Sequence, residues 1–229
     1  MKNLKNALIV LTISVIIFSC GEKKQSNNES EKRENVEKVV ISTIDDAMAE
    51  LKNGNNRFLT GKFINTHYPE QIEASKEKQK PHSVILSCMD SRVPPEIIFD
   101  QGIGNIFVVR NAGNIEDENI LGSMEYAVKF AGSKLILVMG HSHCGAVKGA
   151  IQNIDAGNLT QLLDQIKPSI PKEKNDPGIY EETAKNNVRK TIQDILSRSE
   201  IIKELTDSNQ IKIAGAYYDI ETGKVYFVN

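Results

Sequence analysis

Four short apolar runs along the chain predict the strands of a sheet. Each run is almost continuously apolar rather than alternating, which is typical of strands that are covered on both faces. A fifth run follows a Thr-Gly turn and predicts a hairpin return, hence an antiparallel edge strand. The five runs are Ser83–Ser87, Asn105–Val109, Lys134–Met139, Ile211–Ala216 and, after the turn, Lys224–Val228.

Apolar residues at helical spacing lie between these runs. A helix is expected to start after Ser42 or Thr43, either of which can cap it, and to be interrupted at residues 54–56. Two more helices are expected over Asn119–Ala131 and Glu181–Arg198. Strands that alternate with helices predict an α/β domain: a mostly parallel central sheet of about four strands plus an antiparallel edge strand, flanked by helices.

Composition fits one globular domain and excludes several classes of protein. The 28 Lys and Arg residues nearly balance the 30 Asp and Glu residues, giving a formal charge of −2. A broad nucleic-acid surface needs a basic excess, so no nucleic-acid partner is expected. Three cysteines are too few for a disulfide scaffold of 229 residues.

The N-terminus predicts an export signal. Two lysines precede a short apolar segment, residues 7–18, that runs into Cys20. This arrangement resembles a lipobox, in which cleavage leaves an acylated cysteine at the new N-terminus. The alternative is an uncleaved anchor, but about 12 apolar residues are short for a hydrocarbon core of about 30 Å.

The chain therefore divides into three predicted parts. Residues 1–19 are a lipoprotein signal peptide, and residues 20–38 are the lipidated Cys20 and a polar tether that cannot bury enough surface to fold. Residues 39–229 are the folded domain. We expect the protein in the cell envelope, exported and held through lipid on Cys20 at the periplasmic face or the cell surface.

Candidate chemistry gathers where the first and third runs end. Cys88 directly follows the first run, and His141 and Cys144 follow the third. The carboxyl ends of parallel strands meet at one edge of the sheet, where ligands collect. Two thiolates and an imidazole suit zinc, and three protein ligands leave a fourth position open, as in a catalytic site.

Two other interpretations of these cysteines stay open. Buried thiols without a partner are common in protein cores, and Cys88 and Cys144 of an exported protein could form a disulfide. A disulfide does not account for Asp90 and Arg92 beside Cys88, or for His141 beside Cys144.

These residues resemble the β-class carbonic anhydrases. The motifs are Cys88-x-Asp90-Ser91-Arg92 and a later His141-x-x-Cys144, and the likeness extends from about Met48 to the C-terminus. The resemblance implies one Zn²⁺ per chain, held by the two cysteines and the histidine. It implies reversible hydration of carbon dioxide to bicarbonate and a proton by zinc-bound hydroxide. Asp90 would orient that hydroxide and Arg92 would hold Asp90, although an ordinary surface ion pair is the alternative for these two.

The resemblance also implies a substrate pocket and an oligomer. Gln79, Phe107 and Tyr126 match the pocket of the plant-type branch, where these residues come from a neighbouring subunit. The chain is therefore expected to form a homodimer or a dimer of dimers. Core positions for the aromatic residues, and a plain polar loop for Gln79, are the alternatives.

Two other functions are weighed against carbon dioxide hydration. The same scaffold hydrolyses carbonyl sulfide or carbon disulfide in some relatives, and no feature of this sequence favours that activity. A zinc-binding lipoprotein without turnover is the other, and Asp90, Arg92 and Gln79 argue against it.

Overall fold

The computed structural model describes residues 41–173 and 177–228. The predicted signal peptide, the lipidated Cys20 and the tether lie outside these residues. The described part of the chain contains no helix with the length and apolar character needed to cross a membrane.

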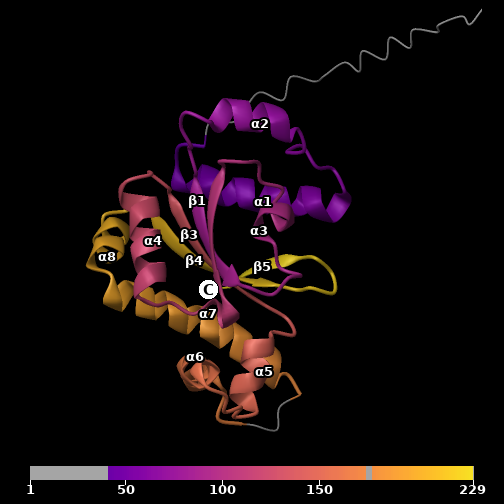
Figure 1. The fold of residues 1–229 in the computed structure, drawn as a ribbon, viewed down its shortest axis with the longest axis vertical. Coiled ribbons are helices and arrows are strands. Elements are labelled where there is room, and N and C mark those ends of the chain that lie inside the picture. Colours follow the sequence, from indigo (N-terminus) through magenta and orange to yellow (C-terminus); the bar gives the residue numbers. More distant parts are fainter. Residues whose placement is uncertain (1–40, 174–176, 229) are drawn as a thin grey trace, which may run out of the picture. The chain divides into compact units, whose positions relative to one another are not determined.

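A five-stranded sheet forms the centre of the fold, in the order β2-β1-β3-β4-β5 (Figure 1). The first four of these strands are parallel, and β5 pairs antiparallel with β4. The predicted fold class is confirmed. The strands are β1 Ser83–Cys88, β2 Ile106–Asn111, β3 Leu135–His141, β4 Lys212–Tyr218 and β5 Val225–Val228.

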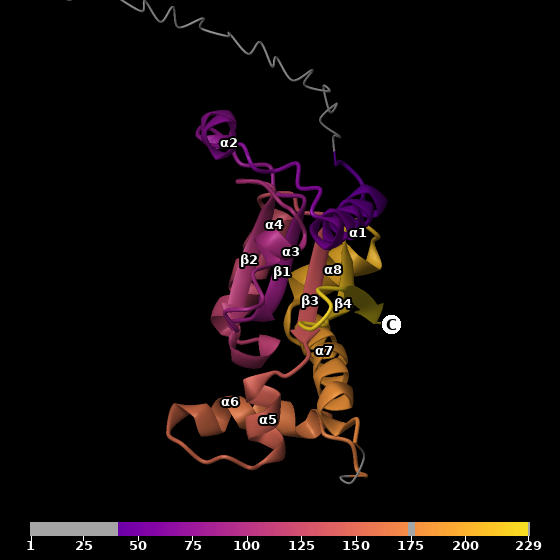
Figure 2. The same ribbon diagram turned by 90° about the vertical axis from the view of Figure 1, so that its right-hand side faces the viewer.

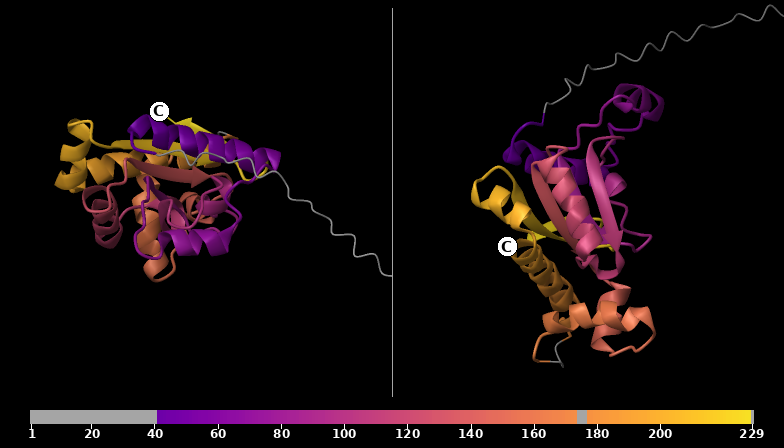
Figure 3. Two further views of the ribbon diagram at one scale, coloured as in Figure 1. Left: turned by 90° about the horizontal axis from the view of Figure 1, so that it is seen from above. Right: turned by 60° about the vertical axis from the view of Figure 1, so that its left-hand side comes forward.

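Helices cover both faces of the sheet because successive residues of each strand point to opposite sides. Val84 and Leu86 of β1 pack in one core, and Ile85 packs in the other. The first core is closed by α4 (Glu118–Lys129), α7 (Ile179–Arg198) and α8 (Glu200–Asp207). The second core is closed by α1 (Ile44–Thr60) and the short α3 (Pro95–Ile98), so α1 lies across the sheet from α4 (Figure 3).

The predicted interruption of α1 at residues 54–56 is wrong. Thr43 caps the helix in a capping box, and the helix continues to Thr60. Gly54 is needed for close packing, since a Cβ there would lie 1.8 Å from the carbonyl oxygen of Phe99. The side chain of Asn55 is buried. It forms hydrogen bonds with the backbone of three residues that are far from it in the sequence. It donates to the carbonyl oxygens of Ile98 and Gly223 and accepts from the Val225 N–H.

The edge strand β2 also differs from expectation, because the described residues do not bury it fully on either face. Its residues are half-buried or exposed, whereas β1 and β3 are buried throughout. Helix α2 (Tyr68–Ser75), which the sequence did not predict, has no buried residue and stands away from the sheet (Figure 2).

Two more unpredicted helices follow β3. Helix α5 (Gly145–Ile151) begins four residues after the end of β3, and α6 (Asn158–Ile166) packs on it. Both lie beyond the carboxyl ends of the strands (Figures 1 and 2). The short 3-10 turn η1 (Ala112–Asn114) follows β2 at the same edge, and a second, η2 (Lys167–Ser169), follows α6. These segments enclose the place where β1 and β3 end.

Candidate metal centre

Cys88, His141 and Cys144 meet at the carboxyl edge of the sheet. Cys88 is the last residue of β1, His141 is the last residue of β3, and Cys144 immediately precedes α5. All three are at least 95% buried, and their ligand atoms lie within 4.8 Å of one another. The structure thus brings together the three residues that the sequence singled out, although Cys88 and Cys144 are 56 positions apart.

His141 and Cys144 approach each other in a way that their spacing did not predict. Residues three apart share a face when they lie on a helix. His141 instead ends a strand, and a tight turn with His143 at φ +55° returns the chain so that Cys144 faces it.

The imidazole of His141 is oriented for a ligand. Its Nδ1 lies 2.8 Å from the carbonyl oxygen of Ser142, so Nδ1 carries the proton and donates it there. Its Nε2 is buried and has no hydrogen-bond partner among the described residues. A buried imidazole nitrogen whose partner nitrogen is fixed by a backbone carbonyl is the usual arrangement of a metal-bound histidine.

The two thiols are close but not bonded. Their Sγ atoms are 3.9 Å apart, well beyond the disulfide bond length of about 2.05 Å. Without a metal the pair shares a proton: the hydrogen bond from Cys144 lowers the pKa of Cys88 to about 4, and the pKa of Cys144 is raised. Sulfur ligands and one imidazole fit Zn²⁺ better than the oxygen-preferring Mg²⁺ or Ca²⁺.

Asp90 and Arg92 form a bidentate ion pair next to this cluster. Arg92 Nε lies 2.9 Å from Asp90 Oδ1, and its terminal nitrogen lies 2.7 Å from Oδ2. The Arg92 backbone N–H also donates to Oδ1, at 2.9 Å. These hydrogen bonds from Arg92 hold the pKa of Asp90 well below its usual range, so Asp90 is a carboxylate at every physiological pH.

Backbone contacts around Cys88 were not predicted from the sequence. Arg110 donates from Nε to the carbonyl oxygen of Cys88 and from a terminal nitrogen to that of Asp90, at 3.0 and 2.6 Å. The N–H of Gly113 donates to Cys88 Sγ at 3.4 Å. Arg110 and Gly113 lie in the segment that carries the family resemblance, but no spacing rule connects them to Cys88.

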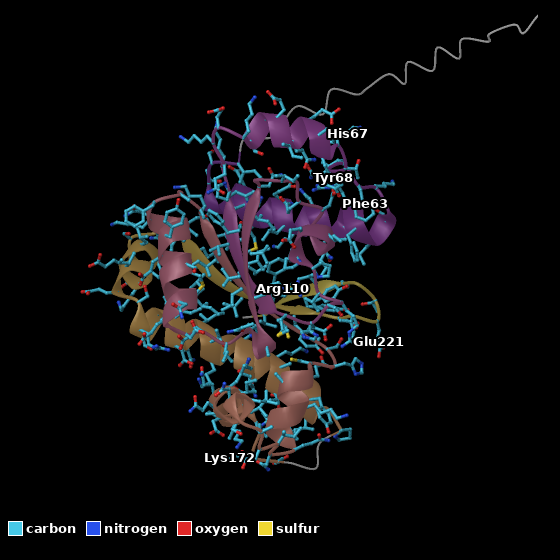
Figure 4. All side chains as sticks on the ribbon, in the orientation of Figure 1. Phe63, His67, Tyr68, Arg110, Lys172 and Glu221 are labelled. Atoms are coloured by element: carbon cyan, nitrogen blue, oxygen red, sulfur yellow. The ribbon has the colours of Figure 1, made fainter. Side chains whose placement is uncertain are left out.

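His143 points away from the cluster into solvent. Its Nε2 lies 2.9 Å from an oxygen of Glu221, and both side chains are largely exposed. Glu221 belongs to the turn before β5. Figure 4 shows it and Arg110 between the end that carries Phe63, His67 and Tyr68 and the end that carries Lys172.

The three predicted pocket residues do not join the cluster within one chain. The Phe107 and Tyr126 rings contact each other at 6.3 Å between centroids, but Phe107 pairs with Val84, four residues before Cys88 in the strand register. At about 3.3 Å per residue this is roughly 13 Å away. Gln79 is exposed and precedes β1, so it lies toward the opposite end of that strand.

Comparisons with known proteins agree with the site. The family model described as carbonic anhydrase matches residues 83–225. "Carbonic anhydrase 2" of Mycobacterium tuberculosis is 37% identical over 185 residues, covering 76% of this chain and 87% of the relative. A carbonic anhydrase of Helicobacter pylori is 34% identical, covering 71% of this chain and 82% of the relative.

Solved structures give the same result. One of the tetrameric β-carbonic anhydrases of the fungus Sordaria macrospora superposes with a TM-score of 0.64 at 27% identity. The match covers 77% of this chain and 94% of the fungal one.

Proposed function

Because this chain belongs to the β-class carbonic anhydrase family, we propose that it catalyses the reversible hydration of carbon dioxide to bicarbonate and a proton. The observation that carries the proposal is the buried cluster of Cys88, His141 and Cys144, in which His141 Nε2 has no partner among the described residues. These residues would hold one Zn²⁺ per chain. When bound, Zn²⁺ acidifies a water and so supplies a nucleophile at neutral pH.

The remaining roles fall to Asp90 and Arg92. Asp90 is ionised, so it only accepts hydrogen bonds. Its Oδ1 accepts two of them from Arg92 and its Oδ2 accepts one, so Oδ2 keeps a lone pair for a further donor. It accepts a hydrogen bond from the attacking oxygen and turns the lone pair of that oxygen toward carbon dioxide. Arg92 fixes both carboxylate oxygens and so fixes the direction of that hydrogen bond.

We further propose that the pocket is completed by a second copy of the chain. Gln79, Phe107 and Tyr126 are the residues that the partner supplies, since they lie far from the metal ligands of their own chain. Exposed apolar residues surround the edge strand β2, as an interface between copies requires. Tyr68, Ile97 and Ile103 are 45–54% exposed and line one hollow of about 510 Å³. The tetrameric Sordaria relative supports an oligomer in this fold.

The location of the protein is a separate proposal that rests on the sequence. We propose that the chain is made as a lipoprotein precursor and is anchored in the cell envelope through lipid on Cys20. Expression of the full chain and of Cys20→Ala in a bacterial host tests this. The wild-type chain is expected to partition into detergent with an acylated Cys20 peptide, and the variant is not. A water-soluble wild-type chain with an unmodified Cys20 would overturn the proposal.

Two assays distinguish carbon dioxide hydration from carbonyl sulfide hydrolysis and from metal binding without turnover. Stopped-flow hydration of carbon dioxide and release of hydrogen sulfide from carbonyl sulfide are measured on the wild-type protein and on His141→Ala. We expect the wild-type protein to hydrate carbon dioxide and His141→Ala to lose both the metal and this activity. Faster sulfide release than hydration would assign the chain to carbonyl sulfide hydrolysis, and zinc without either activity would assign it to metal binding.

A further inference from the structure

A chain of two hydrogen bonds connects helix α7 to one of the sulfur ligands. Asn187 of α7 donates from Nδ2 to the carbonyl oxygen of Gly113 at 2.7 Å. The N–H of Gly113 in turn donates to Cys88 Sγ at 3.4 Å. Residues from two distant parts of the sequence thus act on the same sulfur atom.

Asn187 is placed for this contact and for little else. It is 1% exposed, and its Oδ1 has no hydrogen-bond partner among the described residues. Rotating the amide by half a turn would bring Oδ1 against the Gly113 carbonyl oxygen, where two acceptors repel. The single hydrogen bond to Gly113 therefore fixes the orientation of this buried amide.

Gly113 depends on such support because its backbone is unusual. Its φ is +74°, in the left-handed region, and a Cβ there would lie 2.6 Å from Cδ1 of Ile166. Only glycine fits this position, and glycine by itself does not prefer one conformation. The bond from Asn187 holds the carbonyl of Gly113 and thereby helps to keep its N–H directed at Cys88.

An N–H donor to a ligating sulfur changes the ligand. It withdraws negative charge from the thiolate, which then donates less charge to the metal, and it restrains where the sulfur sits. Mutation of a hydrogen-bond partner of a metal ligand typically lowers metal affinity or activity by about 10- to 100-fold.

We propose that Asn187 is a positioning residue for the metal centre, acting through Gly113 on Cys88. The inference rests on the proposed function, because it presumes that Cys88 is a zinc ligand. It predicts that loss of the Asn187 amide loosens the metal and alters the sulfur–metal bond without removing any ligand.

The matched control for Asn187 is its neighbour on the same helix. Asn186 is half-buried and donates to the carbonyl oxygen of Ser169 at 3.3 Å, away from Gly113. Asn187→Leu and Asn186→Leu each delete one side-chain-to-backbone hydrogen bond from α7 and keep a similar side-chain volume. Asn187→Gln keeps the amide donor and serves as the conservative variant.

Two measurements on the full chain read the metal centre without using catalysis. One is the rate at which zinc passes to an added chelator, and the other is the sulfur-to-cobalt charge-transfer band of the Co²⁺-substituted protein. Asn187→Leu is expected to release zinc about tenfold faster or more. Its band moves to longer wavelength, because a sulfur without its hydrogen bond gives up charge more easily. Asn186→Leu matches the wild type, and Asn187→Gln lies nearer the wild type than Asn187→Leu.

Equal behaviour of Asn187→Leu and the wild type would overturn the inference, and so would equal changes in both leucine variants. If Asn187→Leu does not fold, Asn187→Gln decides. Zinc release and a cobalt band closer to wild type than those of Asn187→Ala support the inference, and values equal to those of Asn187→Ala overturn it. A wild-type protein that binds zinc but fails to hydrate carbon dioxide would contradict the proposed function alone.

Discussion

The Arg92 side chain donates hydrogen bonds to both carboxylate oxygens of Asp90, with nitrogen–oxygen distances of 2.9 and 2.7 Å. The pair lies two and four residues after Cys88, and the Arg92 side chain is 54% exposed. An exposed ion pair contributes at most about 1 kcal/mol to the free energy of unfolding. The geometry is therefore better explained by orientation of Asp90 than by stability.

Arg92→Lys tests that explanation. Lysine keeps the charge but cannot form two parallel hydrogen bonds to one carboxylate. We expect kcat for carbon dioxide hydration to fall about tenfold or more, as for a misdirected catalytic group, while the free energy of unfolding changes by less than about 0.5 kcal/mol. Stopped-flow kinetics and urea denaturation measure the two quantities. Lys203→Ala, which breaks an exposed ion pair with Asp207 on α8, is the control and should leave both unchanged.

Removal of the metal is expected to expose the thiols of Cys88 and Cys144 to oxidation. Their sulfur atoms lie 3.9 Å apart, and both are buried. In the metal-free protein an added disulfide reagent accepts two electrons from the pair and its own S–S bond breaks. The one proton that the pair shares leaves, and the Cys88–Cys144 bond forms. Thiolates bound to zinc resist this exchange. Peptide mapping by mass spectrometry should find the bond only after chelation, and a bond formed equally fast with zinc present would contradict the expectation.

Mixed oligomers test whether one chain completes the pocket of another. A chain with Asp90→Ala lacks its own catalytic carboxylate, and a chain with Phe107→Ala lacks the pocket wall that it gives to its partner. In a mixed dimer of the two, both defects fall on the same site, so the other site is intact. Mixing the two inactive proteins after dissociation should restore up to about a quarter of the wild-type activity, since half of the random dimers are mixed and each has one intact site. No recovery, with mixed dimers demonstrated by mass, would contradict a shared pocket.

Stability at high pH depends on Tyr217. Burial raises the pKa of this phenol from its ordinary value of 10.0 to about 12. The folded state therefore keeps the proton while the unfolded chain loses it, so this contribution to stability is complete below pH 10 and is lost between about pH 10 and 12. At pH 11 the loss is about 1 kcal/mol. Urea denaturation at pH 9 and pH 11 should show a smaller drop for Tyr217→Phe than for the wild type. Tyr226→Phe, at an exposed position of β5, should behave as the wild type does.

The sequence predicted the sheet and the residues of the Cys88–His141–Cys144 cluster because both produce local signals. The strands β1, β3 and β4 are nearly continuous apolar runs, and Cys88 and His141 are the last residues of β1 and β3. Helix α2 was missed because it buries no residue and so has no apolar periodicity. The continuation of α1 through Gly54 was missed because its cause is the carbonyl of Phe99, which approaches only in the folded chain.

The hydrogen bonds that connect Asn187 through Gly113 to Cys88 could not be predicted, for a similar reason. Asn187 and Gly113 are 74 residues apart, and the hydrogen bond between them depends on how α7 packs under the sheet. A buried asparagine in the middle of a helix was the only signal. Such a residue indicates an unspecified partner, and only the fold identifies it.

We propose that the site around Cys88, His141 and Cys144 hydrates carbon dioxide, with Asp90 directing the attack. The most direct test measures zinc content and stopped-flow hydration on the same samples of wild type, Asp90→Asn and the control Asp207→Asn. We expect one zinc per chain in all three, with rapid hydration in wild type and control and a loss of about 100-fold or more in Asp90→Asn. Undiminished hydration in Asp90→Asn, or a zinc-loaded wild-type protein without hydration, would contradict it.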